Sequence, residues 1–181
     1  MWIIVGMLLI LLILYVIITY NKLIILRNRV DDQFSQIDIQ LKRRFDLIPN
    51  LINSVKEYVQ HETETLEKIV HARENYVSAS STEEKIAASD ALTGTLNKLF
   101  SLTESYPELK SNENFLKLQT ELRDTEDKIA IARQFHNDIV LTYNNKVEMF
   151  PSKIVALMFN FKTKEFFKAS HEEKENVKVE I

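Results

Sequence analysis

The chain has 181 residues, 45% of them hydrophobic, with only two glycines and three prolines, a composition that favours long helices over turn-rich β-structure. Its formal net charge of −3 provides no basic footprint for nucleic acid, so nucleic acid is not expected as a partner. The absence of cysteine excludes disulfides, thiolate catalysis and cysteine-ligated metals.

Residues 2–20 carry no charge and consist almost wholly of aliphatic and aromatic side chains. At about 1.5 Å per residue they extend roughly 28 Å, close to the ~30 Å hydrocarbon core of a bilayer. No charge precedes Lys22 and no small-residue cleavage site follows, so we predict a retained single-pass anchor in contact with the lipid bilayer. Basic residues after the span outnumber acidic ones, which places the N-terminus outside and the remaining chain in the cytoplasm. These residues are Lys22, Arg27, Arg29, Lys42, Arg43 and Arg44, against Asp31, Asp32 and Asp38.

An apolar stripe continues the span along the chain to residue 48. Its eleven-residue repeat, about 3.67 residues per turn, keeps it on one face of a nearly straight helix. Because the residue before a proline is pushed out of the α region, Pro49 predicts that this helix ends near Asp46 or Leu47. The anchor is therefore expected to continue, without a flexible link, as the first helix of a bundle. The stripe consists of Leu23, Leu26, Val30, Phe34, Ile37, Leu41, Phe45 and Ile48.

A second helix is predicted from about Asn50 to Ala79, because proline suits the first turn of a helix. Small polar residues at 78–82 then interrupt the pattern, and Ser81-x-x-Glu84 forms a capping box that opens a third helix. This third helix is expected to reach about Tyr106. The second helix has an apolar stripe that includes two polar residues in register: Ile52, Val55, Val59, Leu66, Ile69 and Tyr76, with Glu62 and Arg73.

Asn112 is placed to cap a fourth helix that runs from about Glu113 to Met149. Its apolar positions recur at three and four residues over five heptads, which is typical of a bundle helix. A short helix is expected over Ser152 to Met158. The tail from Phe159 is expected to pack partly against the bundle or a partner, with an extended end where Val177, Val179 and Ile181 alternate with charged residues. The fourth stripe consists of Phe115, Leu118, Leu122, Thr125, Ile129, Ala132, His136, Ile139, Tyr143 and Val147.

A set of short motifs spread over nearly the whole chain resembles the LemA family of bacterial membrane proteins. The motifs are Tyr20-Asn21-x-Leu23, Leu26-Arg27-Asn28-x-Val30, the run from Gln36 to Arg44, the run from Asp46 to Leu51, His61-Glu62, Thr65-Leu66-Glu67, Ala72-Arg73, the run from Tyr106 to Lys110, the run from Asn112 to Phe115, Leu118-Gln119, Thr125-Glu126, Ala132-Arg133, Tyr143-Asn144 and Phe150-Pro151-Ser152. The chain departs from the family at Phe45 and at Phe135-His136, where His and Tyr are more usual, and it lacks a proline near Val177.

The resemblance implies an all-α protein: a transmembrane anchor at residues 1–20, an antiparallel four-helix bundle of coiled-coil type at residues 21–158, and a C-terminal tail at residues 159–181. It implies the inner membrane of a bacterial cell and no established enzyme activity. Some members of the family are tied to magnetosome membranes or lie beside membrane metalloproteases, which suggests scaffolding.

The candidate sites each have a structural interpretation. His61-Glu62-x-x-Thr65 is one residue short of the zincin motif, because Thr65 cannot replace the second imidazole. The four histidines at 61, 71, 136 and 171 show no metal-binding spacing. The triplet Lys42-Arg43-Arg44 lies some 35 Å beyond the span, too far for lipid contact by an upright helix, so a solvated or internally paired face is expected.

A polar series follows one edge of the fourth helix: Glu126, Arg133, Asn137 and Asn144. It could line a binding groove, or it could form an internal network with Glu62 or Arg73; we favour the internal network because buried charges require partners.

No catalytic, cofactor-binding or metal-binding residue is predicted, and no cofactor. The expected function is a membrane-anchored, non-enzymatic helical scaffold or adaptor that binds unidentified protein partners or a second copy of itself. The alternative is an accessory factor of a membrane metalloprotease or of an envelope-stress or membrane-organisation system.

Overall fold

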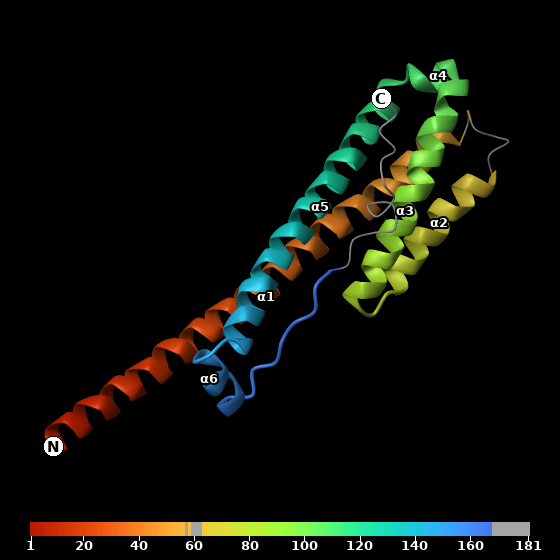
Figure 1. Ribbon diagram of the computed structural model, residues 1–181. Helices are drawn as coiled ribbons and strands as arrows, with labels where there is room; N and C mark the ends of the chain where they lie inside the picture. Colours follow the sequence, from red (N-terminus) through yellow and green to blue (C-terminus); the bar gives the residue numbers. More distant parts are fainter. Residues whose placement is uncertain (57, 59–62, 168–181) are drawn as a thin grey trace, which may run out of the picture. The chain divides into compact units, whose positions relative to one another are not determined.

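The computed structural model describes residues 1–56, 58 and 63–167, and every regular element in these residues is helical, which confirms the all-α prediction (Figure 1). The elements are α1 (Trp2–Val55), α2 (Thr63–Ser78), α3 (Thr82–Leu102), the 3₁₀ helix η1 (Thr103–Ser105), α4 (Pro107–Lys110), α5 (Glu113–Glu148) and α6 (Ser152–Met158). The described residues form two compact units: residues 1–35 with 132–167, called the first unit, and residues 36–131, called the second unit. Each unit is described by itself below.

Helix α1 does not end before Pro49 but continues through it to Val55, so the predicted first reversal at Pro49 is wrong. An internal proline costs about 3 kcal/mol because it removes one backbone hydrogen bond and crowds the preceding turn. Beyond Pro49 the stripe continues at the same spacing to Leu51 and Val55, both fully buried. Each such side chain contributes about 1.5–3 kcal/mol when buried, which offsets the proline.

The second helix is correspondingly shorter than predicted, because α2 begins at Thr63 and ends at Ser78. Ile52 and Val55 belong to α1, whereas Val59 and Glu62 lie outside the described residues. The buried residues of α2 are Thr65, Ile69 and Ala72, which recur at four and three residues and define its inward face.

The capping box at the start of α3 is confirmed. The Oγ of Ser81 accepts a hydrogen bond of 3.2 Å from the Glu84 backbone N–H, and the Glu84 carboxylate accepts one of 3.3 Å from the Ser81 backbone N–H. Hydrogen bonds from Ser80 and Ser81 to the carboxylate lower the pKa of Glu84. Helix α3 ends at Leu102, earlier than the predicted Tyr106, because the chain tightens into η1 and Pro107 then starts α4.

The core of the second unit draws side chains from α1, α2, α3, α4 and α5, and α2 packs against α3 (Figure 1). The ring of Phe45 stacks on that of Tyr76 at a centroid distance of 4.1 Å. Burial raises the pKa of Tyr76 to about 12, with a further contribution from Asp38 and Asp46. The fully assembled core consists of Phe45, Ile48, Leu51, Val55, Ile69, Ala72, Ala88, Leu92, Leu96, Leu99, Leu109, Phe115 and Leu122.

The core of the first unit joins α1 to the C-terminal half of α5 and to the chain beyond it. It consists of Leu23 and Val30 of α1, Val140, Tyr143 and Val147 of α5, and Ala156 and Phe161.

The predicted cap of α5 is confirmed, because the Oδ1 of Asn112 accepts a hydrogen bond of 3.1 Å from the Phe115 N–H. On α5 the inward residue is Val140 rather than the predicted Ile139, which is half-buried.

Helix α6 has the predicted bounds and ends in a Schellman motif. The Phe161 N–H donates to the Ala156 carbonyl at 2.9 Å, and the Asn160 N–H donates to the Leu157 carbonyl at 3.2 Å. Asn160 adopts φ 55°, the left-handed region that asparagine tolerates better than most residues. The turn reverses the chain and directs Phe161 into the core of the first unit.

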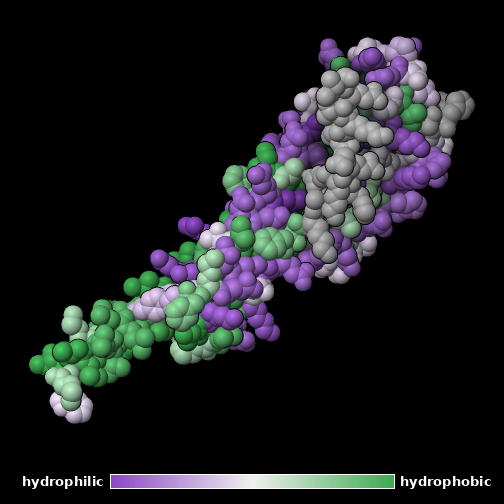
Figure 2. All heavy atoms as spheres, in the orientation of Figure 1, coloured by the Kyte–Doolittle hydropathy of each residue, from purple (hydrophilic) through white to green (hydrophobic). Residues whose placement is uncertain are grey.

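The apolar N-terminal part of α1 stays exposed (Figure 2). Its most hydrophobic 18-residue window has a mean hydropathy of 2.9 and only 6% of it is buried. By length and composition this segment is able to cross a membrane.

Candidate functional site

The histidines in the described part of the chain lie on two different helices. His71 is exposed on α2, with Nδ1 3.1 Å from a carboxylate oxygen of Glu74, and His136 is buried on α5. Thr65, the residue that replaces the second zincin histidine, is buried. His61 and His171 lie outside the described residues. In the described part of the chain no three His, Asp or Glu side chains gather as a metal site would require.

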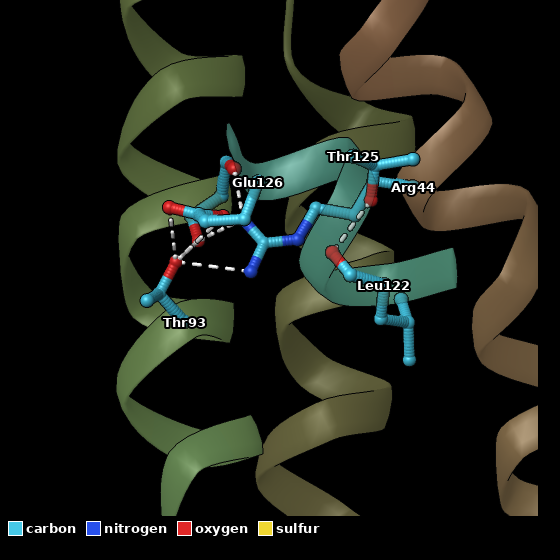
Figure 3. A network of polar contacts seen from close by, with 6 residues as sticks. Arg44, Thr93, Leu122, Thr125 and Glu126 are labelled. Carbon is cyan, nitrogen blue, oxygen red and sulfur yellow. Dashed lines mark hydrogen bonds and ion pairs between the residues drawn. The ribbon is translucent and has the colours of Figure 1, made fainter. Parts of the chain in front are cut away.

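A buried arginine at the centre of the second unit forms the most developed polar cluster (Figure 3). Arg44 is 2% exposed, and its Nη1 forms an ion pair with Glu126. The same Nη1 donates to the Ser89 hydroxyl at 2.8 Å, and Nη2 donates to the Thr93 hydroxyl at 3.0 Å. The Thr93 oxygen lies 3.2 Å from both carboxylate oxygens of Glu126. The guanidinium is therefore held by groups from two other helices.

The local sequence explains why these four side chains meet. Arg44 follows Leu41 by three residues and precedes Ile48 by four, so it lies on the buried stripe of α1. Ser89 and Thr93 are one turn apart on α3 and are small enough to leave room for a guanidinium. A planar guanidinium with several fixed donors suits such a fork of acceptors better than an ammonium would.

The cluster resembles an internal brace more than a reactive site. The partner of Glu126 is Arg44 of α1, and not Arg73 of α2, which was one of the two partners considered from sequence. Next to Glu126, the Thr125 hydroxyl donates to the Leu122 carbonyl at 2.8 Å within α5 (Figure 3). The neighbours of Arg44 in the basic triplet, Lys42 and Arg43, are exposed and solvated.

The rest of the polar series on α5 holds the protein's own C-terminal segment in the first unit. Asn144 bonds Lys164 in both directions, with Nδ2 donating to its carbonyl and Oδ1 accepting from its N–H, each at 2.9 Å. Asn137 does the same with Phe167, at 3.0 and 2.9 Å. The Tyr143 hydroxyl donates to the Lys162 carbonyl at 2.9 Å. Asn137 and Asn144 of the predicted series therefore bind a segment of this same chain.

The spacing of the two asparagines matches the geometry of the segment. Seven helical residues separate Asn137 from Asn144, about 10.5 Å along α5. Three extended residues separate Lys164 from Phe167, about 10 Å. Each side-chain amide therefore bonds the N–H and the C=O of one residue, as a residue of a neighbouring antiparallel strand would. Arg133, the remaining member of the series in this unit, is half-buried on α5.

Aromatic rings complete this contact between α1, α5 and the segment. Phe167 stacks on Phe34 of α1 at 5.6 Å and lies 4.5 Å from the ring of His136. Burial lowers the pKa of His136, and Lys164 lowers it further against the opposing effects of Asn137 and Asp31. Burial also raises the pKa of Tyr143. At neutral pH the imidazole is therefore an uncharged part of an aromatic cluster.

The second unit also has an open groove of about 450 Å³ near the end of α3 and the start of α5. Arg123 lies over the ring of Phe100 at 5.8 Å, and Phe100 meets Phe115 at 6.2 Å. The other lining residues are mostly polar: Asn97, Ser101, Thr103, Glu104, Lys110, Leu116 and Gln119. A polar, open groove of this kind suits a protein surface better than a small apolar ligand.

These features define a class: a helical protein with an exposed apolar N-terminal helix, internally braced cores and no assembled metal site in the described residues. The family model of the LemA family matches residues 33–181, and this chain belongs to that family. It is 30% identical to Protein LemA of Metamycoplasma hominis, over 87% of this chain and 72% of that protein.

Magnetosome proteins are more distant relatives. Magnetosome protein MamQ of Magnetospirillum gryphiswaldense is 24% identical over 82% of this chain. Magnetosome protein MamQ 2 of Paramagnetospirillum magneticum is 23% identical over the same share. This chain spans 64% of the length of each of these two proteins.

Proposed function

We propose that this protein is a membrane-anchored, non-enzymatic helical scaffold or adaptor. One observation carries the proposal: α1 is exposed on all sides over its apolar part, and further along it is buried on one stripe. A helix that is apolar all round needs a lipid or protein environment, whereas a one-sided stripe is typical of a helix in a folded domain. Leu23 and Val30 already belong to the core of the first unit, so α1 passes without a break from the apolar segment into folded protein.

The finer architecture within this proposal is an antiparallel four-helix bundle in the cytoplasm of a bacterial cell, with the N-terminus outside the inner membrane. Charge asymmetry after the span supports this orientation. The natural chain has no cysteine, so single cysteines at Arg29→Cys and Asp38→Cys are clean reporters. Both should resist a membrane-impermeant thiol reagent in intact cells and react after permeabilisation. Labelling in intact cells would reverse the orientation.

The polar chemistry supports a binding role over catalysis. The buried guanidinium of Arg44 is engaged within the second unit by the half-buried Glu126, while the groove of this unit is open and polar. Magnetosome names among the relatives support a role at a membrane-bounded structure.

Affinity capture of the tagged full chain from cross-linked, detergent-solubilised membranes tests the proposal. The matched control is Leu92→Asp, which places a carboxylate at a fully buried position of the second unit and leaves the apolar segment unchanged. We expect protein partners that the natural chain retains and the variant loses, while both remain in the membrane fraction. Recovery of no partner above background, or of the same set with both chains, would contradict a scaffold. Specific capture of a metalloprotease would favour the accessory-factor alternative, and stoichiometric zinc or iron in the purified protein would reopen an enzymatic role.

A further inference from the structure

Helix α6 is apolar on two faces, which a helix of a soluble domain seldom is. One face points inward: Ser152, Val155 and Ala156 are buried. The other consists of apolar side chains that the first unit leaves exposed. Together with Met149 and Phe150, which precede Pro151 at the start of the helix, they are Met149 at 59%, Phe150 at 81%, Ile154 at 57%, Leu157 at 71% and Met158 at 61% exposed.

The position of α6 within the first unit shows what surrounds this exposed face. The ring of Phe159, directly after α6, meets that of Tyr20 at 4.7 Å, and Tyr20 is the last residue of the apolar segment. Ala156 shares a core with Leu23, one turn further along α1. Thr19 is only 2% exposed, whereas the large side chains of residues 2–14 are mostly exposed. Helix α6 therefore lies where the span meets its boundary with water.

Basic residues predominate around α6. Residues 149–162 include Lys153 and Lys162 and no Asp or Glu, and the exposed Glu148 directly precedes them. On α1, Lys22 and Arg27 are exposed at the same level, and the Arg27 guanidinium lies 5.7 Å from the ring centre of Phe161. Apolar side chains flanked by cations and aromatic rings are typical of a helix that lies in a membrane interface with anionic lipids.

A lipid surface fits this face better than a protein partner does. Single exposed apolar residues are ordinary on proteins, but a contiguous group marks an interaction site. Here the group is continuous with the segment that we assign to the bilayer, and its anchoring contacts to Tyr20 and Leu23 leave it at the bilayer surface whenever the span is inserted. A partner protein would have to displace lipid to reach it.

We propose that α6 and the preceding Met149 and Phe150 form an interfacial foot that lies in the headgroup region of the leaflet beneath the folded protein. Phe150, Ile154 and Leu157 enter the upper acyl chains, and Lys153 and Lys162 meet anionic headgroups. The foot rests on the proposed function in one respect, because it requires residues 2–20 to span the bilayer. It gives the first unit a second point of attachment and so restricts its tilt relative to the membrane.

Tryptophan fluorescence in reconstituted vesicles tests the foot. Trp2 is the only tryptophan in the chain, so Trp2→Phe provides a silent background. In this background Leu157→Trp and, separately, Phe150→Trp report on the foot, and Phe135→Trp is the matched control, since Phe135 is 57% exposed on α5. Its neighbour His136 packs on Phe34, about 21 Å beyond Tyr20 along α1, well outside the interface. The vesicles contain phosphatidylcholine and phosphatidylglycerol with a nitroxide high on the acyl chain.

We expect blue-shifted emission and several-fold stronger nitroxide quenching for both foot probes than for Phe135→Trp. Equal, weak quenching of foot and control probes would overturn the foot. A blue shift without lipid quenching would also overturn it, because it would mean that protein covers this face. In the natural chain, nitroxide quenching of Trp2 reports separately on the membrane anchor. Absence of Trp2 quenching would refute the anchor itself. Quenching of Trp2 without quenching of the foot probes would refute the foot alone.

Discussion

Removing Glu126 should destabilise the second unit more than removing the buried arginine that it neutralises. Glu126→Ala takes the Glu126 carboxylate away from a guanidinium that is 2% exposed, although Ser89 and Thr93 still accept its hydrogen bonds. Breaking a fully buried pair from one side costs about 3–5 kcal/mol, and exposed pairs contribute about 0.2–1 kcal/mol. The Glu126 side chain is 36% exposed, which places this pair between the two limits, at about 2 kcal/mol.

Arg44→Met removes the buried charge itself and keeps a flexible apolar chain of similar length in the core. The remaining Glu126 can reach water and keeps the Thr93 hydroxyl as a donor, so we expect a cost of about 1 kcal/mol or less. The double variant Arg44→Met with Glu126→Ala should then be more stable than Glu126→Ala alone, because the guanidinium that loses the Glu126 carboxylate is no longer buried.

The assay is urea unfolding of the full chain in detergent micelles, followed by circular dichroism at the helical band. Asp127→Ala is the control, since it removes an exposed carboxylate next to Glu126 on the same helix. It should change the free energy of unfolding by no more than about 0.5 kcal/mol. A larger loss for Arg44→Met than for Glu126→Ala, or additive losses in the double variant, would refute the argument that desolvation of the guanidinium governs this cluster.

Three further outcomes are expected in the same assay. Asn160→Val should lower the free energy of unfolding by about 1–2 kcal/mol because a β-branched residue resists positive φ, while Asn160→Gly should be neutral or stabilising. Equal losses of stability in the two variants would mean that the asparagine amide matters and not the backbone angle. Because the pKa of His136 is lowered in the folded chain, the unfolded chain binds more protons below about pH 6.5. The stability that His136 contributes is therefore complete above that pH and is lost as the pH falls towards the folded pKa. His136→Phe should flatten this pH dependence, and an unchanged slope would mean that another group causes it. Leu41→Asp should cost about 3 kcal/mol or more because Leu41 is fully buried, whereas Lys42→Asp beside it should have little effect; similar midpoints for the two would mean that the stripe is not core.

Periodicity predicted most of the fold because burial of one face is a local property of each helix. The α1 stripe shows this clearly, since Leu23, Val30, Ile37, Leu41, Phe45 and Ile48 are each no more than 2% exposed. The same rule, followed further, could have corrected the error at Pro49. Leu51 and Val55 continue the stripe at steps of three and four, and a break at Pro49 would have interrupted it. At Pro49 the burial of Leu51 and Val55 outweighs the local tendency of proline to end a helix.

The polar contacts were less predictable, because they depend on which helices meet. The sequence shows that Glu126 needs a partner, but it predicts a solvated or internally paired face for the whole triplet that contains Arg44. Only its place on the apolar stripe distinguishes Arg44 from Lys42 and Arg43. The position of Arg44 on the apolar stripe is therefore the feature of the sequence that predicts its burial. No such feature marks Ser89 and Thr93, since small hydroxyl residues occur on many helix faces.

The sequence shows the spacing of Asn137 and Asn144 on α5, but it does not show that both bind the C-terminal segment. The interval of seven between Asn137 and Asn144 is two helical turns, so both amides emerge on one line along α5. The two asparagine amides require backbone groups about 10 Å apart. Lys164 and Phe167, three residues apart, reach that separation only when the chain between them is extended. Because the same segment also packs Phe161 against Leu23 and stacks Phe167 on Phe34, its ordering depends on the part of α1 that directly follows the apolar span. The part of α1 after the apolar segment and the C-terminal segment are therefore in direct contact, and the polar edge of α5 sets the register in which they meet.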